Sequence, residues 1–334
     1  MSKQTVRRFN NKGYGDAGAS WRKRSLKGFK AHSGSAQEDI DFSNLTMRQR
    51  ARMLYMAAPL ATSAVKTTRT NVVGPGLMLS AKIDREFLGM TPEQADAWQR
   101  TTEKEFAMWA ENRQACDATG LNDFYELQQL ALLSWLQSGD VFCLFKNGAK
   151  TAANPYDLCL HIIEADRIAT PTPWKATGIT LTEGKNPETG NDIHDGVEVD
   201  SSGRVVAYHI RTTYPFELTM KTTDWERIEA VGKKTGMPNI LQIIETERPD
   251  QYRGVSYLAQ VIEPLLQLRR YTEAEITAAM IESSFAGFLC IFQTDVIQNL
   301  THCALNAVPL CRVTKIFVRI FRIPLRHTIC YIFL

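Results

Sequence analysis

The residues in this chain that could do chemistry are few, and they lie apart from one another. Glu164 and Asp166 stand two residues apart beside the end of an expected strand. A metal-dependent nuclease could use such a carboxylate pair together with a third acid and a lysine. No such partner follows at a recognisable spacing, and Arg167 directly after Asp166 favours a structural ion pair or turn contact. We therefore expect this segment to have a structural role.

A second candidate comes close to a phosphate-binding loop. Five residues separate Gly178 from Gly184 where the loop needs four, and Asn186 stands where a Ser or Thr would bind magnesium. The chain also contains no HExxH, GxSxG or EF-hand motif. We therefore expect no catalytic residue, no cofactor and no metal site.

The histidines and cysteines give no stronger signal. His161 and His209 occur in strand patterns, where packing or an edge position explains them. The seven cysteines form no CxxC pair and their number is odd, which favours buried or incidental thiols over a disulfide or zinc framework.

Composition sets the class of protein. A chain of 334 residues with 44% hydrophobic content can bury a core and predicts about two domains. This composition excludes wholesale disorder, collagen and a coiled-coil rod. No uncharged apolar stretch is long enough for a transmembrane helix, and the basic N-terminal segment lacks the apolar core of a secretory signal.

Charge is distributed unevenly along the chain. The net charge is +8 over residues 1–30 and +4 over residues 293–334, which leaves −9 for residues 31–292. An acidic body is a poor general clamp for DNA, because tight DNA binding needs clustered Lys and Arg on the phosphates. The basic N-terminal segment is a candidate for contact with nucleic acid or capsid. Its candidate residues are Arg7, Arg8, Arg22, Lys23 and Arg24.

Helical periodicity predicts three helices in the first half of the chain. The first covers residues 45–73, with Asn44 as its cap, and stops at the turn containing Gly74 and Gly76. We expect residues 77–83 to form a short strand. Thr91, Pro92 and Gln94 begin the second helix, and the third covers residues 121–138, with Asn122 or Asp123 as its cap.

Strands dominate the region that follows. The patterns predict strands at 141–146, 158–163 and 240–244, and a hairpin of 196–199 with 204–210. A long helix is expected from Gly254 to about residue 285, capped by Ser256 and kinked at Pro264. The expected fold class is α+β.

Seven segments in a fixed order carry a family resemblance. They are residues 71–76, 128–142, 163–171, 196–200, 203–210, 247–256 and 271–279. Together they resemble the portal proteins of lambda-like tailed bacteriophages over residues 45–289. The family-motif residues expected to be structural are Gly74, Gly76, Ser138, Gly139, Asp140, Glu164, Asp166, Arg167, Arg248, Pro249, Arg253, Gly254, Ser256, Glu273 and Glu275.

The resemblance implies a portal subunit with a helix and strand wing, a clip region and a stem helix. Such subunits form a ring, typically dodecameric, at one capsid vertex of the virion, after assembly in the host cytoplasm. Double-stranded DNA passes through the ring without sequence-specific binding. The implied partners are other copies of the chain, the terminase large subunit, and capsid and head-tail connector (neck) proteins, and no membrane is involved.

The resemblance also implies a division of the chain. The expected parts are a basic flexible arm (1–45), the wing with the first stem-like helices (46–158), a strand-rich clip-like region (159–252), a long stem-like helix (253–289) and an atypical tail (290–334). The tail has one acid against five bases from residue 293 onward, with Pro309 and Pro324. This composition favours a truncated gene, such as a prophage remnant, as its origin.

Two alternatives stay open from the sequence. One is a DNA-binding or DNA-processing module that uses the basic arm. The other is a membrane-surface protein that uses the amphipathic residues 303–334.

Overall fold

A computed structural model describes most of the chain. The described residues are 18–20, 23–29, 33–148, 150, 155–175, 183–218, 222–284, 288–292 and 328–332, the last two as backbone only. The chain divides into two compact units, Met1–Ile262 and Glu263–Leu334. The first unit holds most of the helices and strands and is described first.

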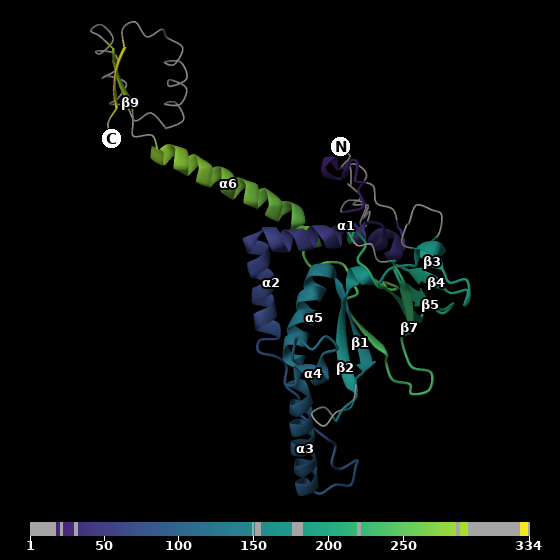
Figure 1. The fold of residues 1–334 in the computed structure, drawn as a ribbon. Coiled ribbons are helices and arrows are strands. Elements are labelled where there is room, and N and C mark those ends of the chain that lie inside the picture. Colours follow the sequence, from purple (N-terminus) through teal and green to yellow (C-terminus); the bar gives the residue numbers. More distant parts are fainter. Residues whose placement is uncertain are drawn as a thin grey trace, which may run out of the picture. The chain divides into compact units, whose positions relative to one another are not determined.

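Five α-helices and two antiparallel sheets make up the described part of the first unit (Figure 1). The helices are α1 (Ala36–Ala57), α2 (Pro59–Val72), α3 (Pro92–Ala110), α4 (Arg113–Cys116) and α5 (Phe124–Ser138). Short 3-10 helices are η2 (Arg24–Leu26), η3 (Ala165–Arg167), η4 (Thr172–Trp174) and η5 (Ala259–Val261).

The first sheet has the strand order β2-β1-β8 and the second runs in chain order from β3 to β7. The strands of the first are β1 (Asp140–Asn147), β2 (Leu158–Glu164) and β8 (Ile240–Ile244). The strands of the second are β3 (Glu183–Lys185), β4 (Asp192–His194), β5 (Val197–Val199), β6 (Val205–Arg211) and β7 (Trp225–Glu229). The expected strands at 141–146, 158–163 and 240–244 and the hairpin at 196–210 are therefore confirmed, as is the α+β class.

The second unit contains most of α6 (Ile262–Ser284) and an antiparallel pair, β9 (Phe288–Phe292) with β10 (Thr328–Ile332). Most of the atypical tail lies outside the described residues.

The first sheet, β2-β1-β8, is covered on both faces. Alternate residues of β1 point to opposite sides, so Phe142 joins a core with β5 and β6, whereas Cys143 joins a core with α3, α4 and α5. This double burial explains why β1 is a nearly continuous apolar run instead of an alternating one. The expected boundary between residues 158 and 159 falls after the first residue of β2, a strand that pairs with β1 along its whole length.

The first helix begins earlier than we predicted. Ser35, not Asn44, caps it, because the Ser35 hydroxyl accepts from the Glu38 amide while the Glu38 carboxylate accepts from the Ser35 amide. Residues 36–45, expected in the arm, are therefore helical. Pro59 then begins a second helix, so the single helix predicted for 45–73 is two helices.

No strand forms at residues 77–83. Side chains instead of a neighbouring strand satisfy this backbone: the Gln128 amide accepts from Leu77 N at 2.6 Å and donates to Leu77 O at 3.1 Å. The Glu103 carboxylate accepts from Ala81 N at 2.9 Å. Residues 77–83 have no regular secondary structure, so the strand predicted there is wrong.

The start predicted for the long helix is also wrong. α6 begins at Ile262, and Pro264 lies in its first turn, where a missing N–H costs no hydrogen bond. Ser256 instead holds the segment before η5, because its hydroxyl accepts from Leu258 N at 3.2 Å. The cap predicted for α3 at Thr91 is confirmed as a capping box, and of the two candidates for α5, Asn122 and Asp123, the structure has Asp123 in a capping box.

The doubly covered sheet makes a clear prediction about stability. Phe142 has no exposed surface and packs edge-on against Tyr208 at 5.5 Å between ring centroids. Replacing Phe142 with Ala should lower the free energy of unfolding by about 3–5 kcal/mol, because it leaves a cavity in a closed core. Leu241→Ala, on the neighbouring strand β8 and 47% exposed, should cost much less. Denaturant unfolding of both variants checks this, and equal losses would contradict the assigned core.

Candidate functional site

Arg253 stands at the centre of the buried polar residues of the first unit. Its side chain is fully buried, and its Nε lies 2.7 Å from Asp140 Oδ2. Its Nη1 lies 2.7 Å from Asp195 Oδ2 and donates to Ile168 O at 3.0 Å. Its Nη2 donates to Ala165 O at 2.9 Å. Burial opposes the charge on the guanidinium, but the attraction of Asp140 and Asp195 outweighs it and raises the pKa of Arg253.

Helix α1 adds a second buried arginine to the same group. Arg48 Nε lies 2.9 Å from Asp166 Oδ1, and Arg48 Nη2 lies 3.1 Å from Asp195 Oδ2. Arg52, one turn further along α1, contacts Asp166 as well. Asp195 therefore joins the two buried arginines. We call Arg48, Arg253, Asp140, Asp166 and Asp195 the arginine junction.

Two glycines let the backbones meet at the junction. A Cβ on Gly254 would stand 1.9 Å from Gly139 O, and a Cβ on Gly139 would stand 2.4 Å from Gly254 C. Gly139 ends α5 with φ of 91°, a value that favours glycine. Gly254 N donates to Asp140 Oδ2 at 3.1 Å, and Gly254 O accepts from the Asn44 amide at 3.0 Å. Only residues without side chains allow this contact.

The turn before Arg253 is tied to the start of α1. Arg248 forms an ion pair with Asp39 and donates to Gly34 O at 2.9 Å. Pro249 and Asp250 form a turn in which Asp250 has a φ of 59°. This turn therefore fixes the N-terminal end of α1, which lies 209 to 214 residues earlier in the sequence.

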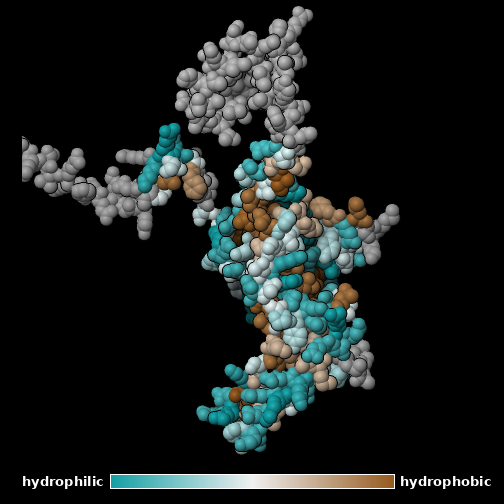
Figure 2. All heavy atoms as spheres, turned by 90° about the vertical axis from the view of Figure 1, so that its left-hand side faces the viewer, coloured by the Kyte–Doolittle hydropathy of each residue, from teal (hydrophilic) through white to brown (hydrophobic). Residues whose placement is uncertain are grey.

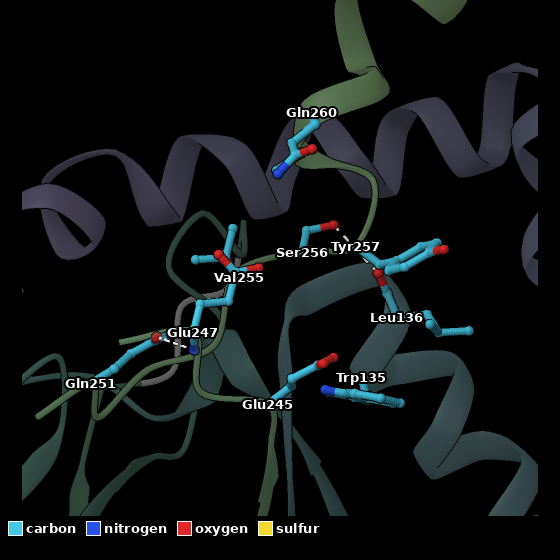
Figure 3. Close-up of a pocket in the computed structure, with 10 residues that line it drawn as sticks. Trp135, Leu136, Glu245, Glu247, Gln251, Val255, Ser256, Tyr257 and Gln260 are labelled. Carbon is cyan, nitrogen blue, oxygen red and sulfur yellow. Dashed lines mark hydrogen bonds between the residues drawn. The ribbon is translucent and has the colours of Figure 1, made fainter. Parts of the chain in front are cut away.

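A small cavity borders the junction (Figure 3). Its volume is 170 Å³, and its lining combines the carboxylates of Glu245 and Glu247 with the rings of Trp135 and Tyr257. Figure 3 places Glu245 beside Trp135, with Ser256 on the opposite side. The Ser256 hydroxyl hydrogen-bonds to Leu136 O at 3.4 Å, so it serves the backbone and is not paired with a general base.

Outside the junction, a further buried carboxylate stabilises the β3–β7 sheet. Glu198 is fully buried and accepts from Arg227 at 2.8 Å, from Asn191 at 2.8 Å and from Asn186 at 3.1 Å. Burial alone would raise its pKa, but these hydrogen bonds, led by Arg227, lower it. His209 contacts the same carboxylate at 3.0 Å. Asn186, which stands at the magnesium position of the near phosphate loop, therefore has a structural partner.

The structure brings four of the predicted family-motif residues into direct contact, namely Gly139, Asp140, Arg253 and Gly254. Asp166 is linked to them through Arg48 and Asp195. Ser138, Glu164, Arg248, Pro249 and Ser256 border the same region. The structural role expected for Asp166 agrees with its contacts, but its ionic partners are Arg48 and Arg52, whereas Arg167 donates to Arg211 O at 3.0 Å.

The other predicted residues lie elsewhere. Gly74 and Gly76 follow α2, and a Cβ on Gly76 would meet the Tyr125 side chain at 2.5 Å. Glu273 pairs with Arg269 on α6, and Glu275 is exposed there. Lys23 and Arg24 are exposed near η2, and Arg7, Arg8 and Arg22 lie outside the described residues.

Sequence reasoning missed the contribution of α1. Asp41, Asn44, Arg48 and Arg52 recur at spacings of three and four residues, which places them on one helical face. We interpreted Asn44 only as a helix cap and did not single out the other three residues, but Asp41, Asn44 and Arg48 are buried. The spacing itself was the available signal.

The described residues contain neither a metal-binding cluster nor a membrane-spanning helix. No group of three or more His, Cys, Asp or Glu side chains there could hold a metal ion. Within the same ranges, no helix is both apolar and long enough to span a membrane. Cys116, Cys143 and Cys159 are free and buried, as expected, and burial raises the pKa of Cys116 and Cys143 to about 11.

The fold and the junction define an α+β protein whose buried charges hold distant segments together. A family model described as "Phage portal protein, lambda family" matches residues 22–294. The chain belongs to this family, which is structural and not enzymatic. The match begins earlier than the expected residue 45, in agreement with the early start of α1.

Two curated relatives agree with this assignment. A protein named "Probable portal protein" of Halomonas phage phiHAP-1 is 27% identical over 293 residues, which are 86% of this chain and 48% of the relative. "Portal protein B" of Escherichia phage lambda is 20% identical over 229 residues, which are 68% of this chain and 40% of the relative. The chain spans about half the length of these relatives.

The junction predicts a large effect of removing its central charge. Arg253→Met should lower the free energy of unfolding by roughly 3–5 kcal/mol, because it leaves Asp140 buried without its countercharge and Asp195 with only Arg48. Arg204→Met, an exposed arginine in the turn before β6, should change it by less than about 0.5 kcal/mol. Thermal and denaturant unfolding of both variants provide the measurement. A tolerated Arg253→Met would show that the junction does not stabilise the fold.

The glycine contact gives an independent test. Gly254→Ala should destabilise the protein by roughly 1–3 kcal/mol, since the added methyl group overlaps the Gly139 carbonyl. Gly148→Ala is the matched control, because its Cβ would meet Cys159 Sγ at an ordinary 3.5 Å. If both variants unfold at the same denaturant concentration, the backbone contact is looser than described.

Proposed function

We propose that this chain is a subunit of the ring at one capsid vertex through which viral DNA is packaged and ejected. Its partners are neighbouring copies, the terminase large subunit, and capsid and head-tail connector proteins. It resides in the virion after assembly in the host cytoplasm, and it catalyses no reaction of its own. Membership of the portal family supports this proposal.

The observation that carries the proposal is the surface of α6. Its large apolar side chains are exposed, among them Leu268, Tyr271, Ile276, Met280 and Ile281, at 42–64% of their surface. At about 100° per residue these positions point to several sides of the helix. A single partner helix would cover only one stripe, so this pattern suits a helix that contacts more than one neighbouring copy.

Helix α3 differs in this respect. Figure 2 shows a mostly hydrophilic surface over α3, which agrees with the exposure of most of its polar residues. More large apolar side chains are therefore exposed on α6 than on α3, and a ring would supply α6 with neighbours on two sides.

The test is assembly of the full chain. We expect oligomeric rings by mass measurement and electron microscopy, and Ile276→Lys should shift the population toward smaller species because it places a charge on an apolar contact. Ile276→Leu, which keeps the apolar surface, should assemble like the unchanged chain. A chain that stays monomeric at all concentrations, or an Ile276→Lys variant that assembles normally, would contradict the proposal.

The salt dependence of binding to duplex DNA distinguishes a portal subunit from the alternative, a DNA-binding module. A dedicated binder should lose affinity for duplex DNA steeply as salt rises, with a slope set by the phosphates it neutralises. A portal subunit should bind duplex DNA weakly at any salt concentration. Incubation with ATP, magnesium and duplex DNA should give no turnover, and an activity abolished by Asp166→Ala would overturn the structural assignment.

A further inference from the structure

The buried face of α1 is polar, which is unusual for a helix that packs on a core. Asp41 is 4% exposed, Asn44 is not exposed at all, and Arg48 is 1% exposed. Arg48 finds its carboxylates in Asp166 and Asp195. The two residues before it on the stripe, Asp41 and Asn44, are less well matched.

Asp41 and Asn44 each keep a buried acceptor atom without a donor among the described residues. The Asn44 amide N–H donates to Gly254 O at 3.0 Å, and this hydrogen bond sets the orientation of the amide group and therefore the position of Oδ1. That Oδ1 and Asp41 Oδ2 are both buried without a hydrogen-bond partner. Residues three apart on a helix are neighbours on its surface, so two unpaired acceptors lie on one part of α1.

The charged groups around Asp41 do not supply a countercharge of its own. Arg48 of α1 and Arg253 before η5 attract it, but both arginines form ion pairs with the carboxylates of the junction. Arg48 Nη1 is also buried, and it hydrogen-bonds to neither Asp41 nor Asn44. Asp195 between β4 and β5 and Glu183 of β3 repel it. Burial is the largest effect, and together with Asp195 it raises the pKa of Asp41 to about 7.

We propose that Asp41 and Asn44 form a buried proton-binding site, in which the protonated Asp41 carboxyl donates through Oδ2 to Asn44 Oδ1. One proton converts two unpaired acceptors into one hydrogen bond and removes one buried negative charge. Asn44 connects this hydrogen bond to the core, because its amide N–H donates to Gly254 O beside Arg253. The site therefore couples the attachment of α1 to pH.

The sign of the coupling follows from the raised pKa. Between the ordinary aspartate pKa of 3.8 and about 7, the folded chain holds a proton that the unfolded chain has released. The stabilisation is complete below this range and is lost as pH rises through about 7. Above it, α1 carries an uncompensated buried carboxylate and is held less firmly.

The experiment compares the unchanged chain with Asp41→Asn, which keeps the shape and donates to Asn44 at every pH. The melting temperature of Asp41→Asn relative to the unchanged chain should rise between about pH 5 and about pH 8 and then level off. Asp39→Asn is the matched control, because Asp39 lies on the same helix but is exposed and pairs with Arg248. Its difference from the unchanged chain should not change over that range.

A direct measurement accompanies the stability series. Infrared difference spectra across the same pH range should show a protonated carboxyl band that disappears with a midpoint near neutrality and is missing in Asp41→Asn. A pH-independent melting difference for Asp41→Asn, or a carboxyl band unchanged by that substitution, would overturn the proposal. Because these readouts concern only folding and protonation of the chain, they are independent of whether it forms a ring.

Discussion

The first unit depends on one buried guanidinium. Arg253 satisfies the carboxylate at the start of β1, two backbone carbonyls around η3 and the carboxylate of the β4–β5 turn, so it touches both sheets at once. Hydrophobic burial can hold these layers together, but it is non-directional. A fully bonded arginine is directional, and it sets the register in which the layers meet.

The surrounding contacts follow from that constraint. The arginine reaches Asp140 only if the chain on either side of it lies against the end of α5, which is why Gly139 and Gly254 face each other without side chains. Helix α1 then closes the group with Arg48, whose partners Asp166 and Asp195 belong to the same segments. Sharing Asp195 between two arginines limits the number of buried charges left without a partner. Asp41 is the remaining acid, and its surroundings favour the neutral form.

Local signals in the sequence were enough for most elements, and long-range contacts accounted for the errors. Thr91 and Asp123 were recognisable caps because a capping box is complete within four residues. Residues 77–83 were assigned to a strand because nothing local reveals that Gln128 and Glu103 bind their backbone. In the same way, Asp166 could be judged structural from Arg167, yet its actual partners lie on α1, more than a hundred residues earlier. Pro264, by contrast, was a local signal for the start of α6 that we interpreted as a kink.

The link between Asn44 and Gly254 also has a consequence for synthesis of the chain. These residues are 210 positions apart, so α1 leaves the ribosome long before the carbonyl that receives it exists. During that interval its polar stripe is hydrated and its few apolar residues have no complete core. Contacts of such separation carry a large loop-closure cost and form late. We expect the two sheets to assemble first and the N-terminal helix α1 to dock on them in the last step of folding.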